Sequence, residues 1–368
     1  MISRCLPAQR TYHIVHEAIS LIRFTCAMIF RQLFEPVSCT YSYLIASRRG
    51  GEAMIIDPVL EKVDRYLQLM QELDLKLVKA VDTHLHADHI TGLGALRDRT
   101  QCITVMGEQS SVDVVSMRIA DGDRLTIEGI SMDVLYTPGH TDDSYCFFMQ
   151  DRVLTGDTLM IRGTGRTDFQ NGDARMQYES LFGKLLRLPN ETIVFPGHDY
   201  KGDTTSTIGE EKAFNPRLQV TSADEYVALM AGLNLSNPKM MDVAVPANMH
   251  QGLHQAEVAR RGWAVCAADA ISLKEAVLID LREASECERH GTIAGALHLP
   301  YPALQEAIHP GGLLRQLAQT SSSQLLFYCA FGERSAMAVR AAQEAGLSRA
   351  IHLEGGIAAW KKAGGVII

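Results

Sequence analysis

Short runs of apolar residues alternate along this chain with segments whose apolar positions recur at helical spacing. Residues 43–46 and 53–57 form two such runs, and the Gly-Gly sequence between them predicts a turn. From residue 63 to residue 73 the apolar positions recur at helical spacing, which predicts a helix. This alternation of predicted strands and helices is typical of an α/β fold.

Four further apolar runs each lead directly into a polar sequence that contains His or Asp. They end before Asp82-Thr83-His84, Thr137-Pro138-Gly139-His140, Thr155-Gly156-Asp157 and Pro196-Gly197-His198. A sheet holds the loops at its strand ends in fixed relation, so side chains from separate loops can meet there. The pattern therefore predicts a site assembled across a sheet, as a metal centre requires.

A second α/β pattern occupies the C-terminal part of the chain. Residues 277–279, 324–328 and 350–353 predict strands, and the Ala-rich segment 334–345 predicts a helix that ends at a glycine. The intervening segment, rich in Ala, Gln and His, has no clear strand and predicts a linker. A length of 368 residues suits two domains. We expect an extension over 1–27, a first domain over 28–250, a linker over 251–270 and a second domain over 271–368.

Composition excludes several classes of protein. With 46% hydrophobic and 21% charged residues, the chain is neither disordered nor fibrous. Its formal net charge of -8 lacks the basic excess of a nucleic-acid binder, so no nucleic-acid partner is expected. The most apolar stretch near the start, 18–30, contains Arg23 and is shorter than the ~20 residues that span a bilayer. We therefore expect no association with a membrane.

The cysteines and the first 27 residues bear on the cellular compartment. The 8 cysteines form no C-x-x-C pair, and we interpret them as mostly reduced thiols of a cytoplasmic protein. The first 27 residues contain three arginines and a single acid, Glu17. We interpret them as an upstream extension, and the alternative is an organelle transit peptide, which would make the protein mitochondrial.

The strongest chemical motif is H-x-H-x-D-H, which begins at His84 directly after an apolar run. Four imidazole or carboxylate groups within six positions are difficult to explain by packing, and such groups bind iron, zinc and similar ions. The other apolar runs each add one further candidate ligand. Together the candidates are His84, His86, Asp88, His89, His140, Asp157 and His198.

In this order the motifs resemble those of the metallo-β-lactamase superfamily, whose members share an αββα sandwich with the metal at one edge. Within it, residues 159–170, 214–218 and 245–248 are similar to the persulfide dioxygenases. Glyoxalase II, which shares the His motif, would carry a helical domain with basic residues for glutathione, and no such block is visible. The resemblance covers about 29–248. It departs after His140, where Thr-Asp-Asp-Ser stands in place of the T-P-G of many relatives.

The resemblance implies one Fe(II) bound by His84, His140 and Asp157. Two His and one carboxylate form the triad of non-haem iron oxygenases, which leaves positions open for substrate and O₂. The remaining candidates would then orient these ligands, whereas a dinuclear zinc hydrolase would use all seven. The sequence leaves both outcomes open. The four orienting residues would be His86, Asp88, His89 and His198.

Three residues are candidates for contacts with the substrate. A guanidinium suits the carboxylates of glutathione, so Arg166 and, with weaker support, Arg217 are substrate-binding candidates. A structural salt bridge is an equally good interpretation of Arg166. Tyr200 follows His198 by two residues and could donate a hydrogen bond near the metal.

Cys329 differs from the other cysteines in its surroundings. It follows the apolar run 325–328 and opens the sequence Cys-Ala-Phe-Gly-Glu-Arg-Ser, which leads into the predicted helix. The N–H groups and dipole at a helix N-terminus favour a thiolate, and Arg334 adds positive charge. Such a loop could hold a cysteine persulfide.

This loop resembles the C-x-x-G-x-R active-site loop of rhodaneses. Residues 278–283, 291–296 and 353–360 are also similar to rhodanese signatures, and the resemblance covers about 272–368. A phosphatase loop is the rival interpretation, but it has C-x5-R, whereas four residues separate Cys329 from Arg334 here. The resemblance implies a sulfurtransferase in which Cys329 and Arg334 are the catalytic residues.

Both families act on sulfane sulfur carried by glutathione. The two resemblances imply oxidation of glutathione persulfide by O₂ to sulfite and glutathione, coupled to sulfur transfer between thiosulfate and glutathione. A zinc-dependent hydrolase of glutathione thioesters and a non-oxidising sulfur carrier are the alternatives. We also expect a homo-oligomer, although the sequence does not fix its size.

Overall fold

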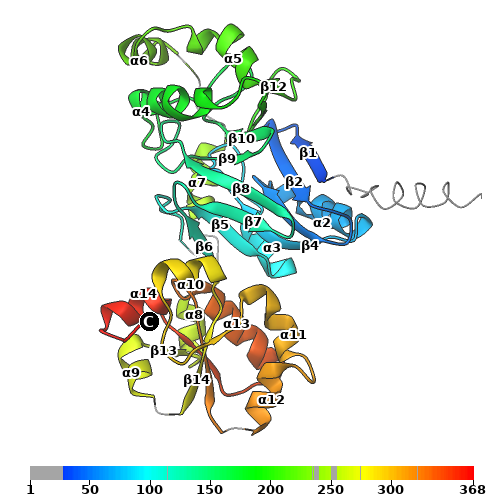
Figure 1. Cartoon of the computed structure of the whole chain (residues 1–368), viewed down its shortest axis with the longest axis vertical. Coiled ribbons are helices and arrows are strands. Elements are labelled where there is room, and N and C mark those ends of the chain that lie inside the picture. Colours follow the sequence, from blue (N-terminus) through cyan, green and yellow to red (C-terminus); the bar gives the residue numbers. More distant parts are fainter. Residues whose placement is uncertain are drawn as a thin grey trace, which may run out of the picture.

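The computed structural model describes residues 28–368, except 114, 234, 236–239, 250–254, 274 and 321. Two domains follow each other along the chain, and each is built on sheets of its own (Figure 1). The expected extension over 1–27 lies outside the described residues. Among those that are described, no helix is both long and apolar enough to cross a bilayer.

The N-terminal domain contains two six-stranded sheets. The first comprises β1 (Ile29–Glu35), β2 (Thr40–Ala46), β3 (Glu52–Ile56), β4 (Lys76–Val81), β5 (Ile103–Gly107) and β6 (Met117–Ile119), in that order across the sheet. The second comprises β7 (Arg124–Ile127), β8 (Ile130–Tyr136), β9 (Tyr145–Met149), β10 (Arg152–Gly156), β11 (Ile193–Pro196) and β12 (Ser206–Thr207), in the order β12-β11-β10-β9-β8-β7. β2 and β5 are buried along their whole length because both faces of the first sheet are covered.

Helices cover the outer faces of both sheets. The first sheet carries α2 (Val63–Glu72) and α3 (Leu93–Thr100), and the second carries α4 (Ala174–Tyr178), α5 (Ile208–Phe214) and α6 (Ala223–Ala231). The domain also contains η1 (Leu60–Lys62), η2 (Glu179–Lys184), η3 (Leu185–Arg187) and η4 (Pro216–Leu218), and its final helix is α7 (Met241–Met249). The predicted helix after the second strand is α2, which packs Val63, Tyr66 and Met70 on the sheet. The layers form the predicted αββα sandwich.

The C-terminal domain is a five-stranded parallel sheet with helices on both faces. Its strands are β13 (Ala264–Val265), β14 (Ala276–Asp280), β15 (Leu297–His298), β16 (Gln324–Tyr328) and β17 (Ala350–Leu353), in the order β13-β17-β16-β14-β15. Its helices are α8 (Gln255–Arg260), α9 (Ala267–Ser272), α10 (Ala284–His290), η5 (Tyr301–Ala303), α11 (Leu304–Ile308), α12 (Leu313–Thr320), α13 (Glu333–Glu344) and α14 (Gly356–Lys362). The predicted α/β class is therefore confirmed in both domains.

The segment expected to link the domains is more ordered than its sequence indicates. It contains α8, the strand β13 and the start of α9, and β13 pairs in parallel with β17 at the edge of the C-terminal sheet. A strand of two residues is too short to produce the periodicity from which strands are predicted.

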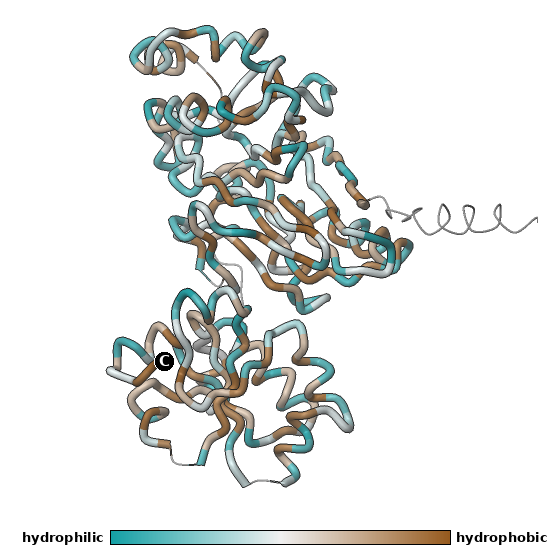
Figure 2. Tube along the Cα trace, in the orientation of Figure 1, coloured by the Kyte–Doolittle hydropathy of each residue, from teal (hydrophilic) through white to brown (hydrophobic). Residues whose placement is uncertain are grey.

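The two domains are joined by apolar packing and by ion pairs. Figure 2 shows hydrophobic segments gathered along the strands, and one cluster of buried apolar side chains includes residues of both domains. Lys79 on β4 pairs with Glu283 at 2.7 Å, and both side chains are largely buried. Among the described residues, Arg97 also pairs with Glu333 across the boundary, at 3.0 Å, and Asp123 pairs with Arg289, at 2.7 Å.

Candidate metal centre and cysteine loop

Three of the predicted ligands lie together at one edge of the N-terminal sandwich. His84 follows β4, His140 follows β8 and Asp157 follows β10. One nitrogen of each imidazole and one carboxylate oxygen of Asp157 lie within 4.8 Å of one another. His84 and His140 are buried, with ring centroids 4.9 Å apart. The structure thus brings two imidazoles and one carboxylate to one point.

The outer nitrogen of each imidazole has a partner that fixes the ring. Nδ1 of His84 lies 2.9 Å from the hydroxyl of Thr83, and Nδ1 of His140 donates to the carbonyl oxygen of Arg166 at 2.7 Å. Gly165 permits this approach, because a Cβ there would lie 2.7 Å from the His140 ring. Burial and the neighbouring imidazoles lower the pKa of His84 well below its ordinary value. It is therefore neutral, as a metal ligand must be.

His198 occupies a different position from the other histidines. Its Nδ1 lies 2.6 Å from Asp157 and its Nε2 lies 2.8 Å from Asp88. Burial alone would lower the pKa of His198, but the two carboxylates raise it well above its ordinary value. Each ring nitrogen thus faces a carboxylate, and the ring orients Asp157.

The rest of the H-x-H-x-D-H motif forms a second group of potential ligands. One atom each of His86, Asp88 and His89 lie within 4.8 Å of one another. Nδ1 of His89 lies 2.8 Å from the carboxylate of Asp88, which also contacts His198. The Asp88 carboxylate therefore has two imidazole partners within the protein.

Two supporting residues were not predicted as part of the site. Asp57, at the end of the strand β3, accepts a hydrogen bond from the Thr83 amide at 2.7 Å and lies 3.2 Å from Nε2 of His86. Burial would lower the pKa of His86, but Asp57 raises it to about 9. Asp57 ends a predicted strand, as the predicted ligands do, but it lacks a neighbouring histidine in the sequence.

Asn248 is the second supporting residue, and it comes from α7 at the end of the domain. Its side-chain amide donates to the carbonyl oxygens of His86 and His89 at 2.9 and 2.8 Å. Its side-chain oxygen accepts from the amide of Thr91 at 3.0 Å. The side chain thereby holds the motif loop from both ends, a role that no local sequence pattern reveals.

The three substrate-side candidates differ in how much of each side chain is engaged by the protein. Arg166 forms a bidentate ion pair with Asp168, with both contacts at 2.6 Å. Arg217 donates to the backbone carbonyl and hydroxyl of Thr164. Tyr200 is 69% exposed, and its ring lies parallel to the His198 ring with centroids 6.2 Å apart. Of the three, Tyr200 is the side chain that is open to solvent beside the histidines.

The cysteine loop joins β16 to α13 at the carboxyl edge of the C-terminal sheet. The amide of Gly332 donates to Sγ of Cys329 at 3.2 Å, and the hydroxyl of Ser335 lies 3.8 Å from the same sulfur. Gly332 has φ of 97°, a left-handed conformation that glycine adopts without strain. The turn therefore wraps backbone around the sulfur of a buried cysteine.

Arg334 is fully buried at the start of α13. Its guanidinium forms two hydrogen bonds with the carboxylate of Glu286 on α10, at 2.7 and 2.6 Å. Burial would lower the pKa of Arg334, but Glu286 and then Cys329 raise it. The guanidinium thus remains charged behind the loop.

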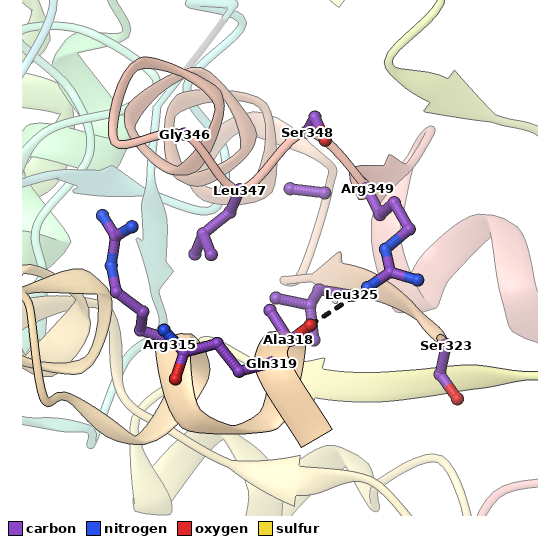
Figure 3. Close-up of a pocket in the computed structure, with 10 residues that line it drawn as sticks. Arg315, Ala318, Gln319, Ser323, Leu325, Gly346, Leu347, Ser348 and Arg349 are labelled. Atoms are coloured by element: carbon purple, nitrogen blue, oxygen red, sulfur yellow. Dashed lines mark hydrogen bonds between the residues drawn. The ribbon is translucent and has the colours of Figure 1, made fainter. Parts of the chain in front are cut away.

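Two cavities lie at opposite ends of the C-terminal sheet. One, of about 820 Å³, lies between the domains and is lined on one side by Ala330 and Phe331 of the cysteine loop. The other, of about 150 Å³, lies where β16 and β17 begin (Figure 3). There Arg315 and Arg349 donate to the backbone carbonyls of Ala345 and Ala318, so they join loops. The larger cavity is therefore the one that adjoins the cysteine loop.

Comparison with known proteins supports both domain assignments. The metallo-beta-lactamase superfamily matches residues 38–198 and the rhodanese-like domain matches residues 265–363. The chain is 45% identical to "Persulfide dioxygenase ETHE1, mitochondrial" of Homo sapiens over 61% of its length and 89% of the relative. It is 31% identical to a "Probable hydroxyacylglutathione hydrolase" of Schizosaccharomyces pombe, over 55% of this chain and 90% of the relative.

A solved structure gives the same result. The crystal structure of ETHE1 from Myxococcus xanthus is 52% identical, with a TM-score of 0.59, and the match covers 60% of this chain and 98% of that one. The two resemblances noted in the sequence are therefore confirmed. The chain belongs to the persulfide dioxygenase family of the metallo-β-lactamase superfamily, and it carries a rhodanese-like domain at its C-terminal end.

Proposed function

We propose that the N-terminal domain oxidises glutathione persulfide with O₂ at a single Fe(II) bound by His84, His140 and Asp157. The reaction consumes one persulfide, one O₂ and one water, and it yields glutathione and sulfite. The observation that carries the proposal is the cluster of two imidazoles and one carboxylate, the donor set of non-haem iron oxygenases. The 45% identity to a human persulfide dioxygenase supports the same activity.

The donor set fits one iron ion. Bound Fe(II) would supply a place for the persulfide sulfur and O₂ to meet, and it would pass electrons to O₂ from the sulfur that is oxidised. His198 lies between Asp157 and Asp88 and is within hydrogen-bond distance of both carboxylates. We assign His86, Asp88, His89 and His198 the role of orienting the ligands.

Substrate contacts follow from which side chains remain available. Tyr200 is exposed beside His198 and can donate a hydrogen bond to the bound persulfide. The Arg166 backbone orients His140, and its guanidinium and that of Arg217 brace the loop after Asp157. We therefore propose that Tyr200 contacts glutathione persulfide directly, and that the two arginines shape the loop that receives it.

The C-terminal domain transfers sulfur through Cys329. The Cys329 thiolate attacks the outer sulfur of thiosulfate, a sulfur–sulfur bond forms, and sulfite leaves with the electron pair of the broken bond. A glutathione thiolate then takes the sulfur, which yields glutathione persulfide and regenerates the Cys329 thiolate. The Gly332 amide and the Arg334 charge stabilise the negative sulfur in both forms. The product of this domain is then the substrate of the other.

Oxygen consumption tests both halves of the proposal. The iron-loaded protein should consume O₂ with glutathione persulfide, and also with thiosulfate plus glutathione in its absence. The Cys329→Ser variant should keep the first activity and lose the second, and Cys266→Ser, at an exposed cysteine, should keep both. O₂ uptake by Cys329→Ser with thiosulfate and glutathione would contradict the assignment of the cysteine.

The alternatives predict other results. A zinc-dependent glutathione thioester hydrolase, like the fission-yeast relative, would bind two zinc ions and release thiol without consuming O₂. A non-oxidising sulfur carrier would take up sulfur on Cys329 whether or not His84 is intact. Metal analysis together with O₂ uptake separates these three functions.

A cytoplasmic location and a homo-oligomeric state remain part of the proposal. The six described cysteines are all free thiols, as is usual in a reducing compartment. Fractionation of the cells that make the protein would test the location, since recovery with mitochondria would contradict it. Light scattering would give the mass of the particle in solution.

A further inference from the structure

The interdomain cavity over the cysteine loop has walls from both domains. Ala330, Phe331 and Glu333, which follow Cys329 in the chain, line one side of it. The opposite side is formed by the N-terminal domain, including Arg118 and Arg124. Its volume of about 820 Å³ falls in the range typical of sites for small organic ligands and exceeds what a thiosulfate ion fills.

The two walls are held in a fixed relation. Arg97 of the N-terminal domain pairs with Glu333 inside the cysteine loop at 3.0 Å, and both side chains are only 3% exposed. Arg118 donates to three backbone carbonyls, those of Gly107, Ser110 and Val112, and thereby fixes its own wall. These contacts therefore fix the positions of both walls of the cavity in the folded chain.

The acidic side chains of the cavity are mostly neutralised. Glu333 pairs with Arg97, Glu286 pairs with Arg334, and Asp123 pairs with Arg289. Glu108 is the fourth carboxylate of the lining, and it accepts a hydrogen bond from Gln109. The acids thus leave little net negative charge to oppose an anion.

Two basic side chains, one from each domain, remain to receive an anion. Within the described part of the chain, Lys361 forms no ion pair with a carboxylate and donates to the carbonyl of His290 at 2.8 Å. Arg124 lies 3.3 Å from Asp133, but both side chains are more than half exposed, so this pair is weak. Burial and then Lys361 and Arg289 lower the pKa of His290, which agrees with a positive local potential.

We propose that this cavity binds the thiol that accepts sulfur from Cys329, and that Arg124 and Lys361 bind the carboxylates of that thiol. The acceptor is a small peptide thiol of the size and charge of glutathione. The inference rests on the proposed sulfurtransferase function and adds that the dioxygenase domain supplies part of the transferase site. In the transfer, the acceptor thiolate bonds to the outer sulfur of the Cys329 persulfide. The bond from that sulfur to Sγ breaks, and its electron pair stays on Sγ.

Steady-state kinetics of the two variants Arg124→Gln and Lys361→Gln test the proposal. Each should raise the KM for glutathione about fivefold, the size expected for one exposed charge–charge contact. The KM for β-mercaptoethanol, which has no carboxylate, should not change. Single-turnover release of sulfite from thiosulfate and O₂ uptake with glutathione persulfide should also stay at the wild-type level.

Each position has a matched control in its own domain. Lys362→Gln changes the next residue of α14, and Arg65→Gln removes an exposed arginine that pairs with Glu72 in the same domain as Arg124. Neither residue lines the cavity. If Arg124→Gln behaves like Arg65→Gln, the dioxygenase domain takes no part in the transferase site. If both thiols are affected equally, recognition of carboxylates is wrong.

Binding separates failure of this inference from failure of the proposed function. S-methylglutathione cannot accept sulfur, and calorimetric titration should show that the Arg124→Gln/Lys361→Gln double variant binds it at this site about 25-fold more weakly than the wild type does. If Cys329 takes no sulfur from thiosulfate, the proposed transferase is wrong, yet the titration still decides whether the cavity binds the peptide. Equal binding by both proteins would overturn the inference.

Discussion

The metal centre and the cysteine loop both lie at the carboxyl ends of strands, but they are held in different ways. The metal centre takes one ligand from each of the loops after β4, β8 and β10, and other side chains such as Asp57 and Asn248 orient them. The cysteine loop is one continuous turn in which a backbone amide contacts the sulfur. The first site therefore depends on contacts across a whole domain, and the second on a local turn and one buried ion pair.

The difference predicts how each site fails. A network of side chains loses function stepwise as its outer members are removed, since each holds one ligand. A backbone turn tolerates changes around it until the ion pair behind it is broken. Four substitutions test this contrast, from the largest expected effect to the smallest.

The substitution His84→Ala should abolish oxidation and leave sulfur transfer intact. It removes one of three ligands, so O₂ uptake should fall by more than the ~100-fold seen when a ligand loses a hydrogen-bond partner. Iron content and O₂ uptake are the measurements, and sulfite release from thiosulfate should not change. His309→Ala, at an exposed histidine of the C-terminal domain, is the control. Parallel loss of both activities would mean that the two sites are not independent.

The substitution Glu286→Gln should destabilise the C-terminal domain. It leaves the guanidinium of Arg334 buried without a carboxylate, which costs about 3–5 kcal/mol of the free energy of unfolding. Both tryptophans, Trp263 and Trp360, belong to this domain, so urea denaturation followed by fluorescence reports it selectively. Glu288→Gln changes an exposed residue of the same helix and should have no effect. If Glu286→Gln leaves the free energy of unfolding unchanged, the ion pair with Arg334 does not stabilise the domain.

The substitution Asn248→Ala should weaken iron binding by about 10- to 100-fold. The side chain holds the carbonyls of His86 and His89, so its loss frees the loop that carries His84. Competition with a chelator of known affinity would measure the change. Asn171→Ala, at an exposed asparagine, should bind iron as the wild type does. Unchanged affinity in Asn248→Ala would show that the loop holds its shape without α7.

The stability of the C-terminal domain should fall in mild acid because of His352. Burial lowers the pKa of this histidine from 6.5 to about 4, so the unfolded chain takes up the proton first as the pH falls. Between pH 7.5 and pH 5 this group should remove about 2 kcal/mol from the free energy of unfolding. His352→Asn should lack that part of the pH dependence when both proteins are unfolded in urea. If the wild type and His352→Asn lose stability equally between pH 7.5 and pH 5, His352 is not the group responsible.

The candidate metal ligands could be predicted from the sequence more readily than the residues that hold their loops in place. His84, His140 and Asp157 could be found because each ends an apolar run, and strand ends converge at one edge of a sheet. Asn248 acts through backbone carbonyls 159 and 162 residues away, a contact that no local pattern records. The guanidinium of Arg166, which the sequence predicts to bind the substrate, pairs with Asp168 two residues later.

Fold prediction followed the same rule. Long apolar runs such as β2, β4 and β16 were recognised from their sequence alone, because burial on both faces requires a continuous apolar segment. The strand β13 has two residues and exists only because β17 lies beside it. The cavity between the domains was also beyond prediction, since its two walls come from distant parts of the chain.

The buried pair of Arg97 and Glu333 has a consequence for how such chains change over evolutionary time. Each residue lies in a different domain, and each is only 3% exposed in the joined chain. Loss of one charge would leave the other buried without a partner at the domain boundary, which would lower the free energy of unfolding by several kcal/mol. Substitutions at the two positions are therefore expected to occur together among descendants that keep both domains. A lineage that separates the domains into two proteins would be released from this constraint.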